Sequence, residues 1–366
     1  MGQTVVPFGD PKAQKKWSGQ LFVETTKKSY WEKFIGNNEN SVIQRKTELE
    51  SDAGDRISFD LSVQLRGGVT KGDDRLKGNE EALRFYTDEV IIDQMRKSVS
   101  AGGKMTRKRT SHDLRRVAKD RLSEYWGLYI DEMTFMYLSG ARGINEDFIE
   151  PVDYAGHAGN PLRAPDAQHL MFGGAAKSKA TLTANDKMSR ELIERAANRA
   201  KMMRARDPKV ANLLPITVNG EKHYCMLMSP DQEYDLRTEQ GAQGWLEIQK
   251  AAAAAEGKSN PIFKGGLGMI NNIVLHSHES VIRFKDYGAG QNVHAARALF
   301  LGRQAAVIAY GSAGGLRFTW QEEMDDFGNE PTVAAGTILG ITKTRFNNRD
   351  FGVMSIDTAA KDPTAA

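Results

Sequence analysis

Few residues in the sequence have the types and spacing that metal binding or catalysis would need, and the clearest group is His276-Ser277-His278-Glu279. Alternate residues of a strand point to the same side, so His276 and His278 could share a metal ion, with Glu279 beside them. No further ligand follows at a usual spacing. We interpret the histidines as surface or hydrogen-bonded side chains, and a metal-dependent enzyme that uses His276, His278 and Glu279 stays as an alternative.

Other motifs of catalysis and cofactor binding are incomplete. His223 and Cys225 have no partners at zinc-site spacing, so we interpret Cys225 as a small buried apolar residue. Gly266-Leu267-Gly268 and Gly288-Ala289-Gly290 lack the third glycine of a dinucleotide-binding fingerprint. The sequence has neither a phosphate-binding loop nor a nucleophile elbow. We therefore predict no catalytic residue, no cofactor and no metal ligand, and a protein that is not an enzyme.

A long charged segment, residues 66–81, lies between two predicted strands. Hairpins usually close in about two to five residues, so a connection of this length indicates a functional or disordered tip. The segment contains four glycines and eight charged side chains, all candidate contacts with another copy of the chain: Arg66, Lys71, Asp73, Asp74, Arg75, Lys77, Glu80 and Glu81.

A basic run follows, with ten Lys or Arg residues and only two acids between Arg96 and Arg121. This run could bind phosphate, pair with acids on a neighbouring copy, or form a solvated face, and the sequence leaves these alternatives open. No module that reads nucleic-acid sequence is recognisable in it. We hypothesise that Arg107, Lys108 and Arg109 pair with the acids of segment 66–81 on a neighbouring copy.

Two strands must carry the charged segment. Apolar and polar residues alternate from Arg56 to Leu65, which predicts a half-buried strand. The return strand is predicted over residues 83–92, with a β-bulge near Thr87 where the alternation shifts its phase. A two-stranded ribbon is barely stable in water by itself. We infer that the ribbon lies on another copy of the protein.

Residues 110–140 are predicted to form one long helix. Thr110 can cap its start, Asp113 has the position of a capping-box acid, and Gly140 supplies the stop. Apolar residues recur at steps of three and four along the segment and cover more than one side. The helix would be about 45 Å long at the α-helical rise per residue, which suits the strut of a thin, flat subunit.

The first fifty residues place large aromatic groups among lysines: Trp17, Tyr30, Trp31 and Phe34. Asp10-Pro11 predicts a helix start, and residues 41–49 predict an extended polar strand. One interpretation is a peripheral helix packed on its own domain. The other is an arm whose aromatic side chains anchor it on a neighbouring subunit, because buried aromatic residues dominate interfaces.

The remainder of the chain predicts a mixture of helices and strands. Residues 141–180 are interpreted as irregular connection, and Thr183 with Asp186 as the start of a second capped helix. A third helix is predicted over 245–256. Strands are predicted over 223–228 and 272–276, residues 298–310 form one long apolar run, and residues 332–344 and 351–356 are predicted to pair as the final strands.

Composition limits the class of protein. The 366 residues carry a net charge of +3 and contain 40% hydrophobic and 27% charged side chains, which is typical of a soluble protein. The small net charge gives no indication that the whole surface binds nucleic acid. Cys225 is the single cysteine, so no internal disulfide can form and synthesis in a reducing compartment is expected. No apolar run approaches the length of a membrane span, and no signal peptide is recognisable.

The order of these elements, together with six short segments, resembles the major capsid proteins of tailed bacteriophages, which have the Hong Kong ninety-seven-type fold. The sequence is similar to one branch in particular, the phage N-four-type capsid proteins. The segments that carry the resemblance are Val6-Pro7-Phe8-Gly9-Asp10-Pro11, Ile43-Gln44-Arg45-Lys46-Thr47-Glu48-Leu49, Tyr137-Leu138-Ser139-Gly140-Ala141-Arg142-Gly143, Asn260-Pro261-Ile262-Phe263-Lys264-Gly265-Gly266, Ala298-Leu299-Phe300-Leu301-Gly302 and Lys343-Thr344-Arg345-Phe346.

The resemblance implies an α+β fold in five parts. Residues 1–52 would be the N-terminal arm, 53–95 the extended loop, and 96–182 the peripheral domain with the spine helix at 110–140. Residues 183–330 would be the axial domain around the capsomer axis. Residues 331–366 would be the closing hairpin of the peripheral domain and the C-terminal tail.

The resemblance also implies a structural function. The chain would assemble with itself, through hexamers and pentamers, into the icosahedral shell around the double-stranded DNA of a tailed phage. Assembly would take place in the host bacterial cytoplasm, and the product would be the virion. A portal, a separate scaffolding protein and decoration proteins are expected partners, and a membrane is not. The scaffolding expectation depends on the fold-like region beginning almost at Met1. A cellular nanocompartment shell of the same fold, resembling encapsulin, stays as an alternative.

Overall fold

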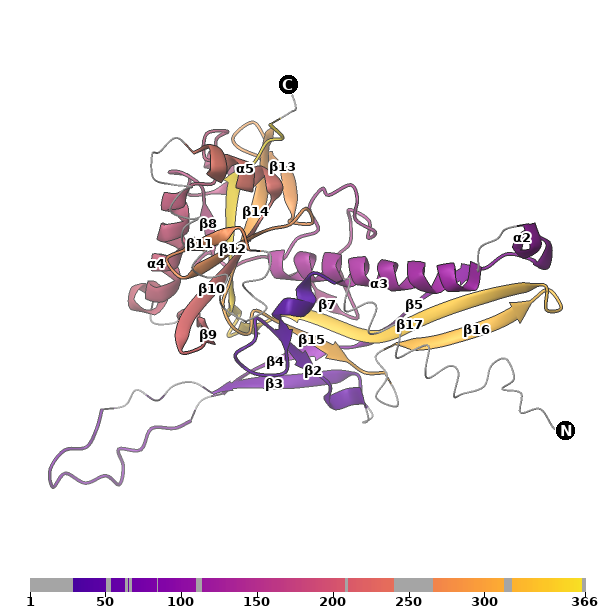
Figure 1. Cartoon of the computed structure of the whole chain (residues 1–366). Coiled ribbons are helices and arrows are strands. Elements are labelled where there is room, and N and C mark those ends of the chain that lie inside the picture. The colour runs from indigo at the N-terminus through magenta and orange to yellow at the C-terminus, as the bar shows by residue number, and fades with distance from the viewer. Residues whose placement is uncertain are drawn as a thin grey trace.

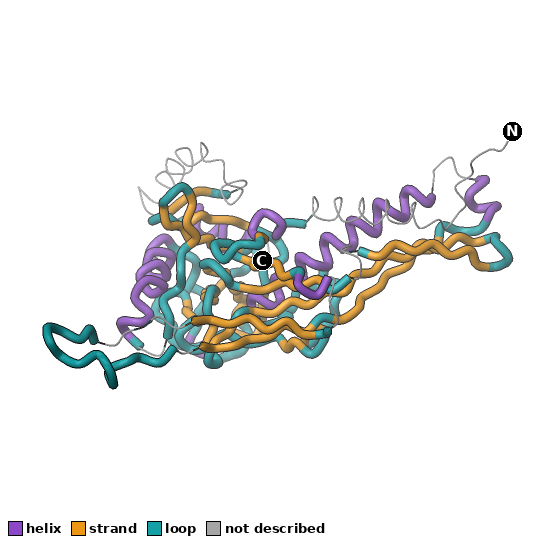
Figure 2. The backbone as a smooth tube through the Cα atoms, turned by 90° about the horizontal axis from the view of Figure 1, so that it is seen from below, coloured by secondary structure: helices purple, strands orange, loops and turns teal. Residues whose placement is uncertain are grey.

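The computed structural model describes residues 29–50, 54–62, 65, 68–83, 85–109, 114–207, 210–239, 266–312 and 318–363. The predicted helix start at Asp10-Pro11, the aromatic residue Trp17 and the predicted helix 245–256 lie outside these residues. The molecule is elongated (Figure 1): a loop projects from one end, and a helix and two long strands extend to the other. Figure 2 shows the same two extensions from below.

A sheet of six strands forms the first layer. Its strands are β1 (Ile35–Gly36), β2 (Ile43–Lys46), β15 (Ala306–Tyr310), β17 (Glu330–Lys343), β16 (Thr319–Asp325) and β5 (Asp93–Ser100). The long strand β17 pairs with β15, β16 and β5, antiparallel in each case. The strand β5 was not predicted, because Met95 and Val99 are its only apolar residues and stand among polar and basic ones.

The predicted long helix is confirmed as α3 (Leu114–Ser139), which lies along this sheet (Figure 1). Its end is as predicted: Gly140 has a left-handed backbone (φ 67°), and its N–H donates to the Met136 carbonyl at 2.8 Å. The predicted capping residues Thr110 and Asp113 lie outside the described residues. A short helix, α2 (Lys104–Arg109), precedes α3. Within the described residues, no helix is long and apolar enough to cross a membrane.

A sheet of eight strands forms the second layer. Its strands are β11 (Gly268–Ile270), β12 (Ile273–Ser277), β10 (Glu221–Met228), β14 (Val293–Leu301), β20 (Val353–Ala359), β8 (Leu170–Phe172), β13 (Arg283–Tyr287) and β9 (Ile216–Val218). Tyr224 and Met226 face one apolar core, while Cys225 and Leu227 face the other. Because both faces are covered, β10 is a continuous apolar run, and the predicted buried strands at 223–228 and 272–276 are confirmed.

Two helices complete this layer, α4 (Arg190–Arg206) and α5 (Pro230–Thr238). The helix predicted to begin at Thr183 begins later, because Ser189 is the residue that caps it and accepts from the Leu192 N–H at 3.3 Å. Thr183 and Asp186 form a separate turn, in which the Thr183 N–H donates to the Asp186 carboxylate at 2.7 Å. The predicted apolar face of the helix is confirmed, with Leu192, Ala196 and Met203 buried.

The last two long strands do not pair with each other, so the predicted final strand pair is wrong. β17 belongs to the six-stranded sheet, whereas β20 pairs with β14 in the eight-stranded sheet. All seven residues of β20 are buried, which requires an interior position that a terminal hairpin could not give. The small hairpin between them consists of β18 (Arg345–Phe346) and β19 (Arg349–Asp350). The apolar run 298–310 likewise divides between the two sheets, as β14 and β15.

The predicted ribbon is confirmed as β3 (Arg56–Ser62) and β4 (Phe85–Ile91), paired antiparallel. The predicted bulge near Thr87 is wrong, since the register runs unbroken from Arg56 opposite Ile91 to Ser62 opposite Phe85. The shift of phase in the sequence has another cause: Asp88, a charged residue, is buried at an inward position of the strand. Sequence alternation alone could not show that a carboxylate points inward.

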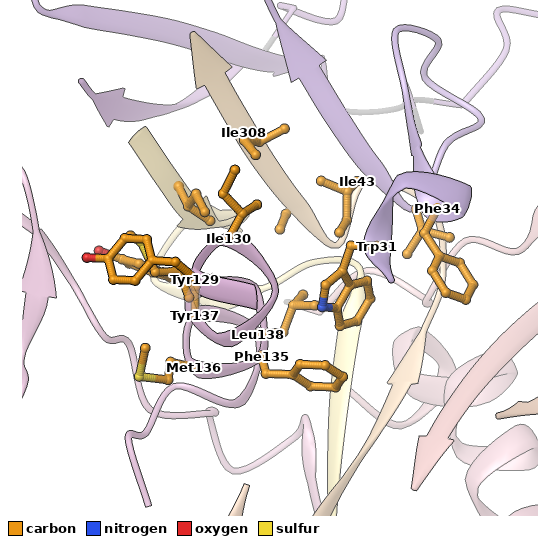
Figure 3. Close-up of a cluster of buried hydrophobic side chains, with 14 of the residues drawn as sticks. Trp31, Phe34, Ile43, Tyr129, Ile130, Phe135, Met136, Tyr137, Leu138 and Ile308 are labelled. Carbon is orange, nitrogen blue, oxygen red and sulfur yellow. The ribbon is translucent and has the colours of Figure 1, made fainter. Parts of the chain in front are cut away.

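The remaining described elements are short: η1 (Trp31–Phe34), η2 (Glu48–Glu50), β6 (Gly156–His157), β7 (Asn160–Pro161) and η3 (Lys179–Thr181). Most of residues 141–180 is irregular, as predicted, apart from these pieces and β8. The largest core lies where η1, α3 and the six-stranded sheet meet. Figure 3 shows Trp31 from η1 beside Phe135 of α3 and Ile43 of β2.

Candidate assembly surfaces

The segment that connects β3 to β4 projects away from the body of the molecule (Figures 1 and 2). Its described residues, 65 and 68–83, are exposed with the exception of the half-buried Thr70. The exposed residues include apolar ones: Val69, Leu76 and Leu83 are 80%, 68% and 61% exposed. Local hydrogen bonds shape the tip, as where the Gly78 N–H donates to the Glu80 carboxylate at 2.7 Å. The segment therefore presents apolar surface that its own chain does not cover.

The charged candidate residues of this segment lie on the surface of the projecting loop. The following are all exposed: Lys71, Asp73, Asp74, Arg75, Lys77, Glu80 and Glu81. Arg66 lies outside the described residues. The structure thus brings these side chains onto one projecting loop, far from the two apolar cores.

A buried ionic contact fixes the base of the loop. The Asp88 carboxylate on β4 accepts from Arg163 Nη1 at 2.9 and 3.0 Å and from the Arg345 N–H at 2.9 Å. Asp88 is 8% exposed. Because Arg163 and Arg345 belong to distant parts of the chain, this single carboxylate joins the ribbon to two segments of the body.

The same contact continues into the β18–β19 hairpin. Arg345 Nε donates to Asp350 at 2.6 Å, and Lys343 Nζ donates to the other oxygen of Asp350 at 2.9 Å. Burial lowers the pKa of Lys343 to about 8, although the Asp350 carboxylate opposes that shift. The Asp350 N–H donates to Asp166 at 2.8 Å. Burial by itself would raise the pKa of Asp166, but the hydrogen bond and charge of His169 lower it well below its usual range.

A second polar contact extends the ribbon edge. The Asn160 side chain accepts from the Ile91 N–H at 3.0 Å and donates to the Ile91 carbonyl at 2.7 Å, as a neighbouring strand would. Gly340 of β17 lies directly beneath, and a Cβ there would come within 2.1 Å of the Ile91 carbonyl oxygen. The ribbon is therefore held against the body by specific polar and backbone contacts.

The aromatic candidates of the arm lie inside the chain's own core. Trp31 and Phe34 are 0% and 2% exposed. They pack within their own chain, as the first interpretation predicted, and leave no exposed surface for contact with a neighbouring subunit. Tyr30 is half-buried and stacks on Phe135. Sequence reasoning could not separate the two interpretations, because an aromatic residue among lysines fits either.

A buried carboxylate fixes the start of this segment to the long helix. Asp131 of α3 accepts from Ser29 Oγ and from the Tyr30 N–H, both at 2.7 Å, and from the Trp31 N–H at 3.3 Å. Burial raises the pKa of Asp131 to about 6, even though these hydrogen bonds favour the charged form. Residues 29–31 are therefore fixed to one defined point of α3.

The histidine candidates for a metal site lie in the same core. His278 packs on Tyr30 and Phe135, with ring centroids 4.3 and 5.0 Å away. His276 is fully buried, and its Nδ1 lies 3.5 Å from Lys33 Nζ. Burial, reinforced by Lys33, lowers the pKa of His278 to about 4. Among the described residues, no group of three possible metal ligands occurs, so the two rings lie in aromatic packing rather than in a ligand set with Glu279.

The basic run is spread over several elements. Lys108 and Arg109 are exposed on α2, and α2 also contains Arg107, whose side chain is outside the described ones. Lys97 on β5 lies over the Tyr125 ring at 5.0 Å. Lys119 is 8% exposed on α3. The run is therefore not one continuous basic face, because its exposed bases lie on β5, α2 and α3.

One further buried ion pair, which the sequence did not indicate, joins two strands of the eight-stranded sheet. Arg297 of β14 binds Asp357 of β20 through two hydrogen bonds of 2.7 and 2.8 Å, and it donates to the Ser139 carbonyl at the end of α3 at 2.9 Å. Burial by itself would lower the pKa of Arg297, but the negative charge of Asp357 and its hydrogen bonds raise that pKa above its usual value. A charged residue inside an apolar strand pattern is the signal that could have identified Arg297 and Asp88.

Comparison with known proteins gives consistent results. A family model described as "Phage capsid protein" matches residues 5–362. The "Major capsid protein" of Pseudomonas phage KPP25 is 27% identical over 373 residues, and the match covers 94% of each chain.

Solved structures extend the comparison. The capsid of Ralstonia phage GP4 is 66% identical, covers 100% of both chains and superposes with a TM-score of 0.89. The capsid asymmetric unit of cyanophage Pam1 is 21% identical, covers 92% of this chain and 93% of that chain, and has a TM-score of 0.70. The second likeness is one of fold.

Proposed function

The chain belongs to the phage capsid protein family, and from this membership we propose that it assembles through hexamers and pentamers into an icosahedral shell around double-stranded DNA. It is a structural protein with the α+β fold expected from the sequence, the Hong Kong ninety-seven-type capsid fold.

The projecting loop, residues 68–83, is the observation that supports the proposal most. It exposes Val69, Leu76 and Leu83. Covering these apolar side chains with another protein surface would remove them from water and stabilise the segment. A neighbouring copy supplies that surface in a head-to-tail arrangement, which closes into a ring when the rotation between copies allows it.

The buried contact at the loop base supports a defined docking direction. Because Asp88 binds both Arg163 and Arg345, the ribbon leaves the body at a fixed angle. A loop that is already oriented loses less conformational entropy when it docks on a neighbour. We propose that this preorganisation sets how adjacent copies join.

Exposed charge supports specificity between copies. Lys108 and Arg109 of α2 are exposed, and we propose that they pair with acids of another copy. Salt weakens the attraction between exposed charges and largely screens it beyond a Debye length, which is ~8 Å at physiological ionic strength. Assembly that depends on them should therefore weaken as salt rises.

Negative-stain electron microscopy with light scattering on the chain expressed alone tests the proposal. Shells, tubes, or rings of five and six copies are expected. Neutralising Arg107, Lys108 and Arg109 together should lower the salt concentration at which assemblies disappear, whereas neutralising the exposed Lys361 near the C-terminus should not. A chain that stays monomeric alone and with co-expressed phage head proteins would refute self-assembly.

The remaining partners stay predictions of the family resemblance. A portal, a scaffolding protein, decoration proteins and packaged DNA are proposed partners of the assembled shell, and assembly in the host cytoplasm is proposed with them. Co-purification of particles with nucleic acid of genome length supports the virion over a cargo compartment, since a compartment of this fold would hold enzymes instead.

A further inference from the structure

An exposed apolar patch lies beside the long helix, where the chain returns after α3. Leu128 of α3 is 54% exposed, and Ile149 and Val152 in the connection that follows α3 are 42% and 69% exposed. We call Leu128 together with residues 146–153 the flank patch. Apolar side chains gathered on a surface in this way often mark a site where another protein binds.

The flank patch is separate from the base of the projecting loop. Val307 of β15 packs against the ribbon, whereas the next residue, Ile308, packs in the core that α3 covers. Figure 1 accordingly shows α3 on one side of the six-stranded sheet and the strands β3 and β4 on the other. A partner on the flank patch would therefore leave the ribbon and its contacts undisturbed.

Hydrogen bonds hold the connection against α3. The Glu132 carboxylate accepts from the Ile149 N–H at 2.9 Å, and the Tyr129 hydroxyl donates to the Glu150 carboxylate. Leu128 lies one helical turn before Glu132, so the two side chains share a face of α3. The exposed Leu128 therefore borders the connection and continues its apolar surface.

Two further contacts fix the backbone of the patch. Arg142, which is buried, donates from Nε and Nη2 to the Glu150 carbonyl at 2.9 and 2.7 Å. The Tyr154 N–H donates to the Pro151 carbonyl at 3.0 Å and closes the turn that presents Val152. A segment whose backbone is already fixed loses less conformational entropy when a partner binds it.

Negative charge surrounds these apolar side chains. Residues 143–162 contain no Lys or Arg and four acids: Glu146, Asp147, Glu150 and Asp153. Asp147 lies 3.7 Å from Arg283 in an exposed ion pair. Within the part of the chain that the structure describes, the exposed carboxylates of Glu146 and Asp153 have no hydrogen-bond or ion-pair partner. The flank patch therefore combines apolar surface with uncompensated negative charge.

This combination selects among possible partners. Acidic side chains repel the phosphates of nucleic acid. The projecting loop of another copy has four bases and four acids in residues 66–81, so its net charge offers no attraction. The basic helix α2 of another copy has only six residues, of which Met105 is the only large apolar one, so it could not cover three apolar side chains. A longer helix with apolar residues on one face and bases along its borders complements both properties.

We propose that the flank patch is a docking site for a basic amphipathic helix of a second protein. Apolar side chains of that helix cover Leu128, Ile149 and Val152, and its bases lie near Glu146 and Asp153. The inference goes beyond the proposed self-assembly, because the bound molecule is a different protein and its binding does not require a closed shell.

Fluorescence anisotropy with a labelled synthetic peptide tests the docking site on the full-length chain. The peptide has about 18 residues, or five helical turns, with Leu on one face and Lys on the other; a peptide with Glu in place of Lys is the charge control. We expect the Leu/Lys peptide to bind and the Leu/Glu peptide not to bind. Glu146→Gln combined with Asp153→Asn should weaken binding several-fold, as should Val152→Ser. Glu191→Gln combined with Glu194→Gln, which removes two exposed acids from α4, is the matched control and should leave the affinity unchanged.

Photo-crosslinking from a leucine analogue in the same peptide locates the contact. Crosslinks to residues 146–153 and Leu128 are expected. Crosslinks concentrated elsewhere, equal binding of the two peptides, or equal affinities of the patch variant and the α4 control would overturn the inference. A patch variant that changes the oligomeric state of the chain alone, measured by light scattering, would assign the surface to a second copy and overturn it as well. Because peptide binding needs no shells, microscopy separately recognises a failure of the proposed self-assembly.

Discussion

Replacing Asp88 by Asn should release the projecting loop from its fixed direction. The carboxylate accepts two contacts from Arg163 and one from the Arg345 N–H, and Asn keeps its shape. Both oxygens face donors, so an amide in either orientation places an N–H₂ group against an N–H group. The loss of one partner from a buried ion pair costs about 3–5 kcal/mol. Arg163 is 23% exposed, so water can replace part of the contact, and we expect about 2–3 kcal/mol.

Urea denaturation of the unassembled chain measures this cost. A loss of about 2–3 kcal/mol corresponds to a roughly 30- to 150-fold lower folding equilibrium constant. Glu89→Gln on the adjacent position is the matched control, because its ion pair with Arg56 is exposed on both sides and should contribute about 0–1 kcal/mol. Hydrogen exchange over residues 85–91 should accelerate in the Asp88 variant and not in the Glu89 variant.

A double-mutant cycle identifies the partner. If Asp88 acts through Arg163, then Asp88→Asn combined with Arg163→Met should cost clearly less than the sum of the two single changes. Additive costs, or a free energy of unfolding for Asp88→Asn within about 0.5 kcal/mol of the Glu89→Gln value, would refute the reasoning that this carboxylate orients the loop.

Three more predictions concern the body of the subunit. Trp31→Ala should destabilise the monomer by about 3–5 kcal/mol in urea denaturation, because Trp31 is fully buried in its own core; a stable monomer that fails only in assembly would favour an interface instead. Gly340→Ala should prevent soluble folding, since the new Cβ would lie 2.1 Å from the Ile91 carbonyl oxygen, whereas Gly68→Ala has open space and should fold normally; equal soluble yields would contradict the packing. Burial raises the pKa of Glu132 from 4.5 to about 7, so the folded state binds its proton more tightly and the free energy of unfolding should fall as pH rises from 4.5 to 7. Glu132→Gln should flatten that part of the pH profile, and an unchanged slope would show that another group is responsible.

Local sequence patterns were sufficient for the elements whose surroundings are uniform. The α3 helix repeats its apolar residues at helical spacing and ends at a glycine that adopts the left-handed backbone. The strands β3 and β4 alternate because one face of the ribbon is covered and the other is open. The long charged connection between them could also be located, since turn and loop composition differs sharply from that of a strand.

The sequence also determined most of the function, through the resemblance of its element order and short segments to phage capsid proteins. It could not determine which strands pair, because pairing joins residues far apart in the chain. The apolar run 298–310 gives no sign that β14 and β15 belong to different sheets, and the final strands β17 and β20 look like a hairpin although each pairs elsewhere. These choices depend on which faces become covered, which only the packed structure decides.

The tertiary structure likewise decided where the charges and aromatic residues of the candidate surfaces lie. Trp31 and Phe34 turned inward because η1 packs on α3, while Phe327, in a short turn with no marked pattern, faces outward. Asp88 is buried because Arg163 and Arg345 come from distant segments to bind it. A single sequence specifies the type of each side chain and its local spacing. Its partners follow only when the two sheets and the long helix are assembled, because burial and ion pairing depend on neighbours that are remote along the chain.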